Sequence, residues 1–207
     1  YAFFNTGFSE LPSGKNLRNI GNYAFSECKN LVNPTIPSTY THIGNYAFSE
    51  CKNLVNITIP NSVTTIGENV FMNCDGLTSI PRGENLHEIG DGQYCGCDGL
   101  VDVTIPDNIT SIGESAFADC SNLEKMIIPD NVDSIGCNIF SRCYSLKELT
   151  LPFAATEREY AETDGISTDG FGQVQDMFNA DGWDFGSGLS DEYTIARILI
   201  SGGQTIQ

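Results

Sequence analysis

The segment LVDVTIPDNITSIGESAFADCSN, at residues 100–122, decides the fold of this chain because its pattern returns every 23 residues. An Ile-Gly pair recurs with its glycine at Gly21, Gly44, Gly67, Gly90, Gly113 and Gly136. Three further columns keep the same period: the aromatic residues Phe25, Phe48, Phe71, Tyr94, Phe117 and Phe140, the cysteines Cys28, Cys51, Cys74, Cys97, Cys120 and Cys143, and the leucines Leu31, Leu54, Leu77, Leu100, Leu123 and Leu146. Four columns in phase over six copies predict a stack of repeats.

Each copy is predicted to form one coil of a solenoid. Ile57 and Ile59 alternate with Thr58, which is the period of a strand with one buried face. Pro60 ends the strand because proline has no N–H to donate, and Gly67 permits a tight corner. A single coil cannot bury its apolar side alone, so stacked coils form the core. Successive strands are then expected to be parallel and about 4.8 Å apart.

The pattern LxxITIPxxVTxIGxxAFxxCxx, best seen at residues 100–122, resembles the BspA-like leucine-rich repeat, and its six copies cover about two-thirds of the chain. The resemblance implies a curved α/β-type solenoid with a parallel β-sheet on the concave face. It also implies a secreted or surface-attached protein of a bacterium or protist, often an adhesive one. On that ground we expect an extracellular or cell-surface location.

The chain is expected to have two regions. Residues 1–152 form the solenoid, which has six repeats and a partial first coil, because Tyr1-Ala2-Phe3 repeats Tyr23-Ala24-Phe25. Residues 153–207 lose the period and carry 10 acidic and 2 basic residues. We expect this second region to be a C-terminal capping segment, in which residues 193–200 form a strand or a short helix.

Two copies depart from the pattern at their strand. Pro34 replaces the first inward isoleucine of one copy, and the fourth copy reads Ile80-Pro81-Arg82-Gly83 where others read Ile-Thr-Ile-Pro. Because proline cannot donate to a strand ladder, both strands are expected to be shortened.

The charge of the chain excludes several functions. Asp and Glu number 27 against 10 Lys and Arg, which gives a net charge of −17. Such a field repels phosphate groups, so no nucleic-acid binding is expected.

No apolar run reaches the roughly 18 residues that a membrane helix needs, so no membrane insertion is expected either. The hydrophobic share of 40%, with 12 Phe and 8 Tyr, indicates a packed core.

The cysteine column is expected to hold buried thiols. Side chains one coil apart lie about 4.8 Å apart, which exceeds the usual Cβ separation of a disulfide of roughly 3.5–4.5 Å. A straight column does not supply the tetrahedral ligands of zinc. Cys95 and Cys137 lie outside the column, and their redox state is left open.

No convergent catalytic or metal site is visible in the sequence. His42 and His87 lie about two coils apart, and Asn179, Asp181 and Gly182 match only three positions of a calcium-binding EF-hand loop. We therefore expect a protein that is not an enzyme and that has no cofactor and no metal site.

The outward columns of the strands are the candidate binding face, because concave faces of solenoids are the usual docking sites. This face is expected to bind a protein or glycan through Asn56, Thr58, Asp102, Thr104, Lys125, Ile127, Glu148 and Thr150. The alternative is a solvated β surface on which threonine occurs for its strand propensity.

A second function remains open at this stage. The first coil presents an open edge, and such edges can pair with another chain. The chain would then be a structural subunit that assembles head to tail, as a homo-oligomer, into an extracellular filament or ring.

Overall fold

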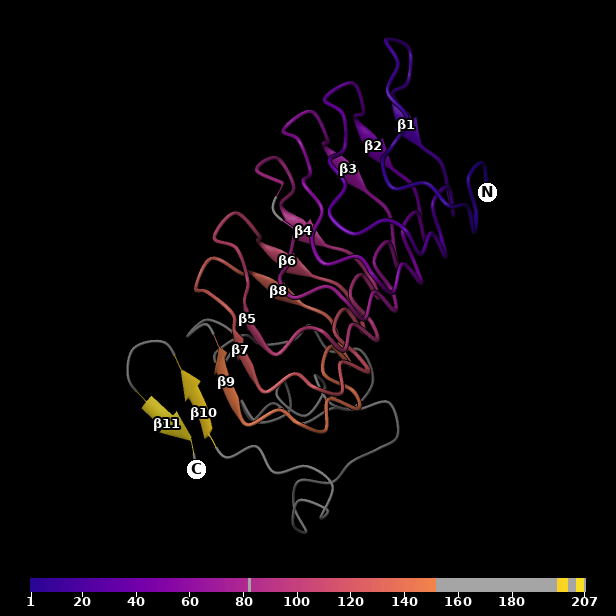
Figure 1. Cartoon of the computed structure of the whole chain (residues 1–207). Helices are drawn as coiled ribbons and strands as arrows, with labels where there is room; N and C mark the ends of the chain where they lie inside the picture. The colour runs from indigo at the N-terminus through magenta and orange to yellow at the C-terminus, as the bar shows by residue number, and fades with distance from the viewer. Residues whose placement is uncertain (82, 152–196, 201–203, 207) are drawn as a thin grey trace, which may run out of the picture.

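The computed structural model describes residues 1–81 and 83–151, together with the backbone of two strands at 197–200 and 204–206. Successive coils stack side by side, with the N-terminal coil at one end and the two last strands at the other (Figure 1). The expected solenoid is therefore confirmed. Every regular element within the described ranges is a strand, so the helical part of the expected α/β class is not found there.

A row of two-residue strands runs along the solenoid, one immediately before the glycine of each Ile-Gly pair (Figure 1). We call these strands and the glycines that follow them the glycine row. The strands pair in parallel one repeat apart, with Ile20 opposite Ile43 and Ile43 opposite Ile66. They form two sheets, β1-β2-β3 and β4-β6-β8. The strands are β1 (Asn19–Ile20), β2 (His42–Ile43), β3 (Thr65–Ile66), β4 (Glu88–Ile89), β6 (Ser111–Ile112) and β8 (Ser134–Ile135).

A second, longer sheet is formed by the strands that the Ile-Thr-Ile-Pro pattern predicted. Its parallel strands are β5 (Asp102–Thr104), β7 (Lys125–Ile127) and β9 (Glu148–Leu151), and we call their outer surface the strand face. The sheet continues with β10 (Arg197–Ile200), which is parallel to β9, and β11 (Gln204–Ile206), which is antiparallel to β10. Part of the strand expected at residues 193–200 thus forms. The rest of the expected cap lies outside the described residues.

The earlier coils hardly form this second sheet. Thr35 and Thr58 make one isolated parallel bridge, and the fourth coil has no strand at Ile80-Pro81. Neither coil with a proline at this position has a strand there, which agrees with the expected effect of Pro34 and Pro81. The third coil between them, whose Ile57-Thr58-Ile59 pattern is intact, forms only the bridge.

The core consists of the columns that the sequence predicted. The aromatic rings stack from Phe3 through Phe140, with centroids 5.1–6.5 Å apart. The six leucines of the leucine column are buried. Tyr1 and Phe3 stack on Tyr23 and Phe25, which extends the aromatic stack to the first residues of the chain.

The six column cysteines are buried thiols, as expected. Each thiol donates a hydrogen bond to a backbone carbonyl of the preceding coil, such as Cys51 to Phe25 at 3.1 Å and Cys120 to Tyr94 at 3.2 Å. Burial raises the pKa of Cys51 and of Cys120 to about 12, because a thiolate there would lose its hydration. The column therefore satisfies carbonyl oxygens of the turns and carries no charge at neutral pH.

At four of the six Ile-Gly pairs, those of Gly44, Gly67, Gly113 and Gly136, the glycine is required for close packing of the coils, and not for a special backbone angle as the sequence suggested. A Cβ on Gly67 would lie 2.6 Å from the backbone nitrogen of Asn45, and one on Gly136 would lie 2.5 Å from that of Glu114. Gly21 has nothing within 4 Å of the same position. The steric reason for the glycine is thus the backbone of the preceding coil.

Two turn positions in each coil adopt the left-handed region. In the first full copy these are Tyr23, with φ of 56°, and Glu27, with φ of 59°. Side chains at such positions carry strain of about 1–2 kcal/mol each. In the fourth coil the two positions are Gly92 and Gly96, which adopt this conformation without that strain.

Candidate functional site

Six of the eight predicted binding residues lie on the strand face. Asp102 and Thr104 are on β5, whereas Val103 between them is buried. The same alternation holds on β7 and β9, where Met126 and Leu149 are the buried residues. Because side chains alternate along a strand, the six predicted residues point outward.

The outer surface of the strand face has a charged row. Asp102 is opposite Lys125, and Lys125 is opposite Glu148, in the parallel register of the sheet. The Lys125 Nζ lies 3.2 Å from a carboxylate oxygen of Glu148, and both side chains are nearly half exposed. Ion pairs this exposed contribute less than about 1 kcal/mol to stability, so the row can exchange its internal contacts for those of a partner at low cost.

A second row lies beside the charged one. Thr104 is opposite Ile127, which is opposite Thr150. Thr104 is exposed, and the other two side chains are half-buried. The two hydroxyl groups flank an aliphatic side chain, so this row offers hydrogen bonds and an apolar contact next to the charged row.

The other two predicted residues, Asn56 and Thr58, lie in the third coil, away from the strand face. The fourth coil, which has no strand there, separates them from β5. Thr58 is exposed and bridges to Thr35, and the Asn56 side-chain oxygen accepts a hydrogen bond from the N–H of Ile57 at 2.8 Å. The structure therefore divides the predicted face into a group of six and a group of two.

The remaining polar residues do not converge on a reactive centre. His42 Nδ1 lies 2.6 Å from the Thr41 hydroxyl, and His87 Nδ1 lies 3.0 Å from the carbonyl oxygen of Asn108. Within residues 1–81 and 83–151, no three His, Cys, Asp or Glu side chains are placed to hold a metal ion. The EF-hand-like residues 179–182 lie outside the described part of the chain.

The sequence analysis did not predict a groove of about 510 Å³ on the glycine row. It extends from Ile66 in β3 to Ser134 in β8, and its carboxylates are Glu68, Glu88, Asp91 and Glu114. The signal is visible in the sequence, because an acidic residue directly follows three successive glycines, Gly67, Gly90 and Gly113. The signal is weak because this column is acidic only in the middle copies and holds Asn22, Asn45 and Cys137 in the others.

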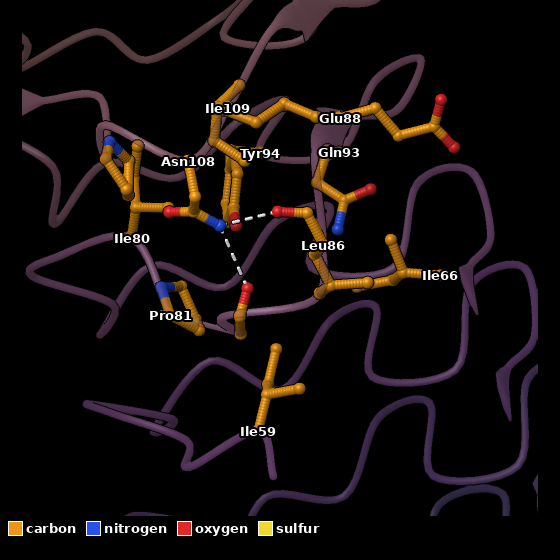
Figure 2. A pocket seen from close by; sticks show the side chains of 13 residues that line it. Ile59, Ile66, Ile80, Pro81, Leu86, Glu88, Gln93, Tyr94, Asn108 and Ile109 are labelled. Carbon is orange, nitrogen blue, oxygen red and sulfur yellow. Dashed lines mark hydrogen bonds between the residues drawn. The ribbon is translucent and has the colours of Figure 1, made fainter. Parts of the chain in front are cut away.

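A small pocket of about 20 Å³ lies beside this groove, at the fourth coil (Figure 2). It is lined by Pro81 and by Asn108, whose side-chain amide donates to the carbonyl oxygens of Gly83 at 3.0 Å and Leu86 at 2.5 Å. Gln93 also lines the pocket and is only 2% exposed. Its Oε1 is buried and has no hydrogen-bond partner.

Coils of 23 residues with buried leucine, aromatic and cysteine columns define a leucine-rich repeat solenoid. The chain belongs to the family described as the BspA type leucine-rich repeat region, whose family model matches residues 1–123 and 68–161 in six copies. No curated protein sequence matches the chain.

Several solved structures of bacterial leucine-rich repeat proteins are similar to this chain. A leucine-rich repeat protein from Bacteroides ovatus is 28% identical with a TM-score of 0.65, over 74% of this chain and 40% of that one. A leucine-rich cell surface protein from Faecalibacterium prausnitzii is 26% identical with a TM-score of 0.56, over 88% of this chain and 54% of that one. The T. pallidum leucine-rich repeat protein is 28% identical with a TM-score of 0.57, over 69% of each chain.

The chain therefore spans about half of the length of the first two of these proteins. Across the ranges that the structure describes, no helix has the length and apolar character needed to cross a bilayer.

Proposed function

We propose that this chain is a non-catalytic binding module of an extracellular or cell-surface protein, and that it docks a protein or glycan on the strand face. The observation that carries the proposal is the registered pair of rows on β5, β7 and β9. One row is charged, and the other combines hydroxyl groups with an aliphatic side chain. The location is supported by the cell-surface description of the F. prausnitzii protein.

The geometry favours a partner that is held by several spaced contacts. The six side chains lie on three neighbouring strands, which are about 4.8 Å apart. Their buried neighbours Val103, Met126 and Leu149 fix the backbone beneath them, so little order has to be gained on binding. Such a preformed surface supports recognition without catalysis.

A charge swap on the strand face tests the proposal. The variant Lys125→Glu with Glu148→Lys keeps an ion pair within the protein but reverses the charges that a partner meets. Binding to an array of glycans and secreted proteins is measured for the parent chain and the variant. We expect at least one ligand of the parent chain to be lost by the variant.

The control exchanges a pair of charges away from the strand face. Lys52 Nζ lies 3.5 Å from Asp75 in the turns of the second and third coils, so Lys52→Asp with Asp75→Lys is a matched swap. If both swaps leave the same ligands bound, or both remove them, the strand face is not the binding surface.

The second candidate function is self-assembly at the N-terminal coil. Three aromatic side chains of this coil are exposed: Tyr1 by 75%, Phe4 by 40% and Phe8 by 44%. The position beside Gly21 is also open, whereas the corresponding position at Gly44 lies within 3 Å of the preceding coil's backbone. A second copy docking here would form a heterologous contact that leads to a ring or filament.

Sedimentation velocity over a hundredfold range of concentration tests this assembly. Association that Phe4→Ser weakens would support it. A monomer at the highest concentration would contradict it and leave the strand face as the functional surface.

A further inference from the structure

The groove on the glycine row lies where the coils are least tightly joined. At the other described joints the N–H of the Ile-Gly glycine donates to the isoleucine of the preceding coil, as from Gly67 to Ile43 and from Gly113 to Ile89, at 2.7–2.8 Å. Between the third and fourth coils, among the residues that the structure describes, Gly90 does not donate to Ile66, and β3 does not pair with β4. The groove extends across this joint.

The groove is strongly acidic. All four of its carboxylates are exposed, and none of the ion pairs among the described residues involves them. Glu68, Asp91 and Glu114 occupy equivalent positions in successive coils, so like charges are neighbours along the groove. No Lys or Arg is among the described residues that line the groove.

The fold does not need these charges. The side-chain oxygen of Asp91 accepts a hydrogen bond from the N–H of Glu114 at 2.8 Å. In the earlier coils an amide oxygen does the same, since Asn22 accepts from the N–H of Asn45 at 3.0 Å and Asn45 from that of Glu68 at 3.3 Å. Asparagine is therefore sufficient for this turn. The acidic side chains repel one another, which lowers the stability of the fold, and they make no hydrogen bond that asparagine could not make.

A buried acceptor lies beside the groove, in the small pocket. Gln93 occupies the core position that holds alanine, valine or isoleucine in the neighbouring coils, namely Ala47, Val70, Ala116 and Ile139. Its partnerless Oε1 lies 3.1 Å from where a Cβ on Gly90 would be, and Gly90 lines the groove. The small pocket that Gln93 lines shares Ile66, Glu88 and Ile89 with the groove (Figure 2). A donor arriving through the groove would satisfy this oxygen.

We propose that the groove binds a cationic, lysine-bearing segment of a protein partner, with the carboxylates attracting its ammonium groups and Gln93 Oε1 accepting a hydrogen bond from one of them. An ammonium group has three donors and no acceptor, so it can donate to the carboxylates of the groove and to Gln93 Oε1. A pocket of about 20 Å³ holds one group the size of a water molecule, so it fits an ammonium group and excludes the planar guanidinium of arginine. This surface is separate from the strand face.

The test uses fluorescence anisotropy with a labelled peptide of alternating Gly and Lys that carries five lysines. The variant Glu68→Gln, Asp91→Asn, Glu114→Gln removes three groove charges and keeps side-chain oxygens at these positions. The control Glu10→Gln, Glu84→Gln, Asp107→Asn removes three exposed charges elsewhere. We expect the groove variant to weaken binding roughly tenfold or more, and the control to weaken it by less than about threefold, at about 0.15 M salt.

A second comparison tests the role of Gln93. The parent chain is expected to bind the lysine peptide more tightly than the same peptide with arginine, and Gln93→Val is expected to remove this preference while both peptides still bind. Thermal unfolding of each variant checks that the solenoid is intact. Equal weakening of peptide binding by the groove and control variants would show unspecific attraction to an acidic protein and would overturn the proposal. An unaltered preference for the lysine peptide in Gln93→Val would overturn it as well.

Discussion

The fourth coil, residues 77–99, and the fifth coil, residues 100–122, have the same length and the same columns but differ on both faces. The fifth coil contributes β5 to the strand face and β6 to the glycine row, and both strands pair with the next coil. The fourth coil has no strand at Pro81, and its β4 does not pair with β3. The pocket beside Gln93 lies at this interruption.

The turns and the core are nevertheless continuous through the fourth coil. The Tyr94 ring stacks on Phe71 at 5.7 Å and on Phe117 at 5.5 Å, and the Cys97 thiol donates to the carbonyl oxygen of Phe71 at 3.0 Å. Backbone bonds of the turns also cross the joint, such as that from the N–H of Asn69 to Asp91 at 2.9 Å. The comparison teaches that the core columns and the turns hold the solenoid together. The solenoid continues through a coil at which both sheets are interrupted.

The largest expected effect is at the aromatic column. Phe117→Ala in the fifth coil and Tyr94→Ala in the fourth should each lower the free energy of unfolding by about 3–5 kcal/mol, because both rings are buried between two others. Urea unfolding followed by circular dichroism measures both. A Tyr94→Ala cost of less than half the Phe117→Ala cost would mean that the interruption of the sheets weakens the core as well.

Substitutions of the glycines in the glycine row should lower stability by different amounts in the two coils. A Cβ on Gly113 would lie 2.7 Å from the backbone nitrogen of Asp91, whereas one on Gly90 would come no closer than 3.4 Å to the preceding backbone. We expect Gly113→Ala to cost about 1–3 kcal/mol, with Gly90→Ala costing less. Gly21→Ala, which meets no atom within 4 Å, should change stability by no more than about 0.5 kcal/mol. Equal melting temperatures for the three variants would refute the steric reason for the glycine.

The column thiols predict that the fourth and fifth coils both lose stability at alkaline pH. Burial holds the pKa of Cys120 in the fifth coil at about 12, above its ordinary value of 9.0, and raises that of Cys97 in the fourth coil as well. A raised pKa in the folded state means that stability is complete below pH 9 and is lost as the pH rises toward 12. The free energy of unfolding should be lower at pH 10 than at pH 8 by on the order of 1 kcal/mol for each column thiol whose pKa is raised, namely Cys51, Cys74, Cys97, Cys120 and Cys143.

Thiol labelling at pH 8 provides the matching kinetic measurement. Cys97 and Cys120 should react only as fast as the chain opens. The half-buried Cys95, whose pKa is raised to about 11 by burial and by the carboxylate of Asp119, should react faster than either. Equal labelling rates for the three would contradict the burial of the column.

The smallest effect is expected at the pocket. Gln93→Val removes a buried oxygen that has no partner and restores an aliphatic residue, so it should raise the free energy of unfolding by about 1 kcal/mol. The converse variant in the fifth coil, Ala116→Gln, should be destabilising because no pocket exists to receive the amide. A destabilising Gln93→Val would show that the amide stabilises the fold by more than its unpaired oxygen costs, for example through its hydrogen bond with Tyr94.

The sequence alone determined the coils, their period and their core. Leucine, aromatic and cysteine residues at a constant interval can be buried together only if successive coils stack in register, so the columns Leu100, Phe117 and Cys120 follow from periodicity. Pro81 likewise predicted a shortened strand, because the loss of a donor is a local property of the residue, and the structure has no strand there.

The tertiary structure decided the features that depend on how far apart neighbouring coils lie. Only the stacked coils show that the Ile-Gly glycine meets the backbone of the coil before it, that the joint at Gly90 is looser than the one at Gly113, and that Asn56 and Thr58 are cut off from the strand face. The same holds for the groove, since Glu68, Asp91 and Glu114 become one charged surface only when their coils are in contact. Periodicity specifies which residues are equivalent, but the spacing of two coils results from all of their contacts together, and no single repeat encodes that sum.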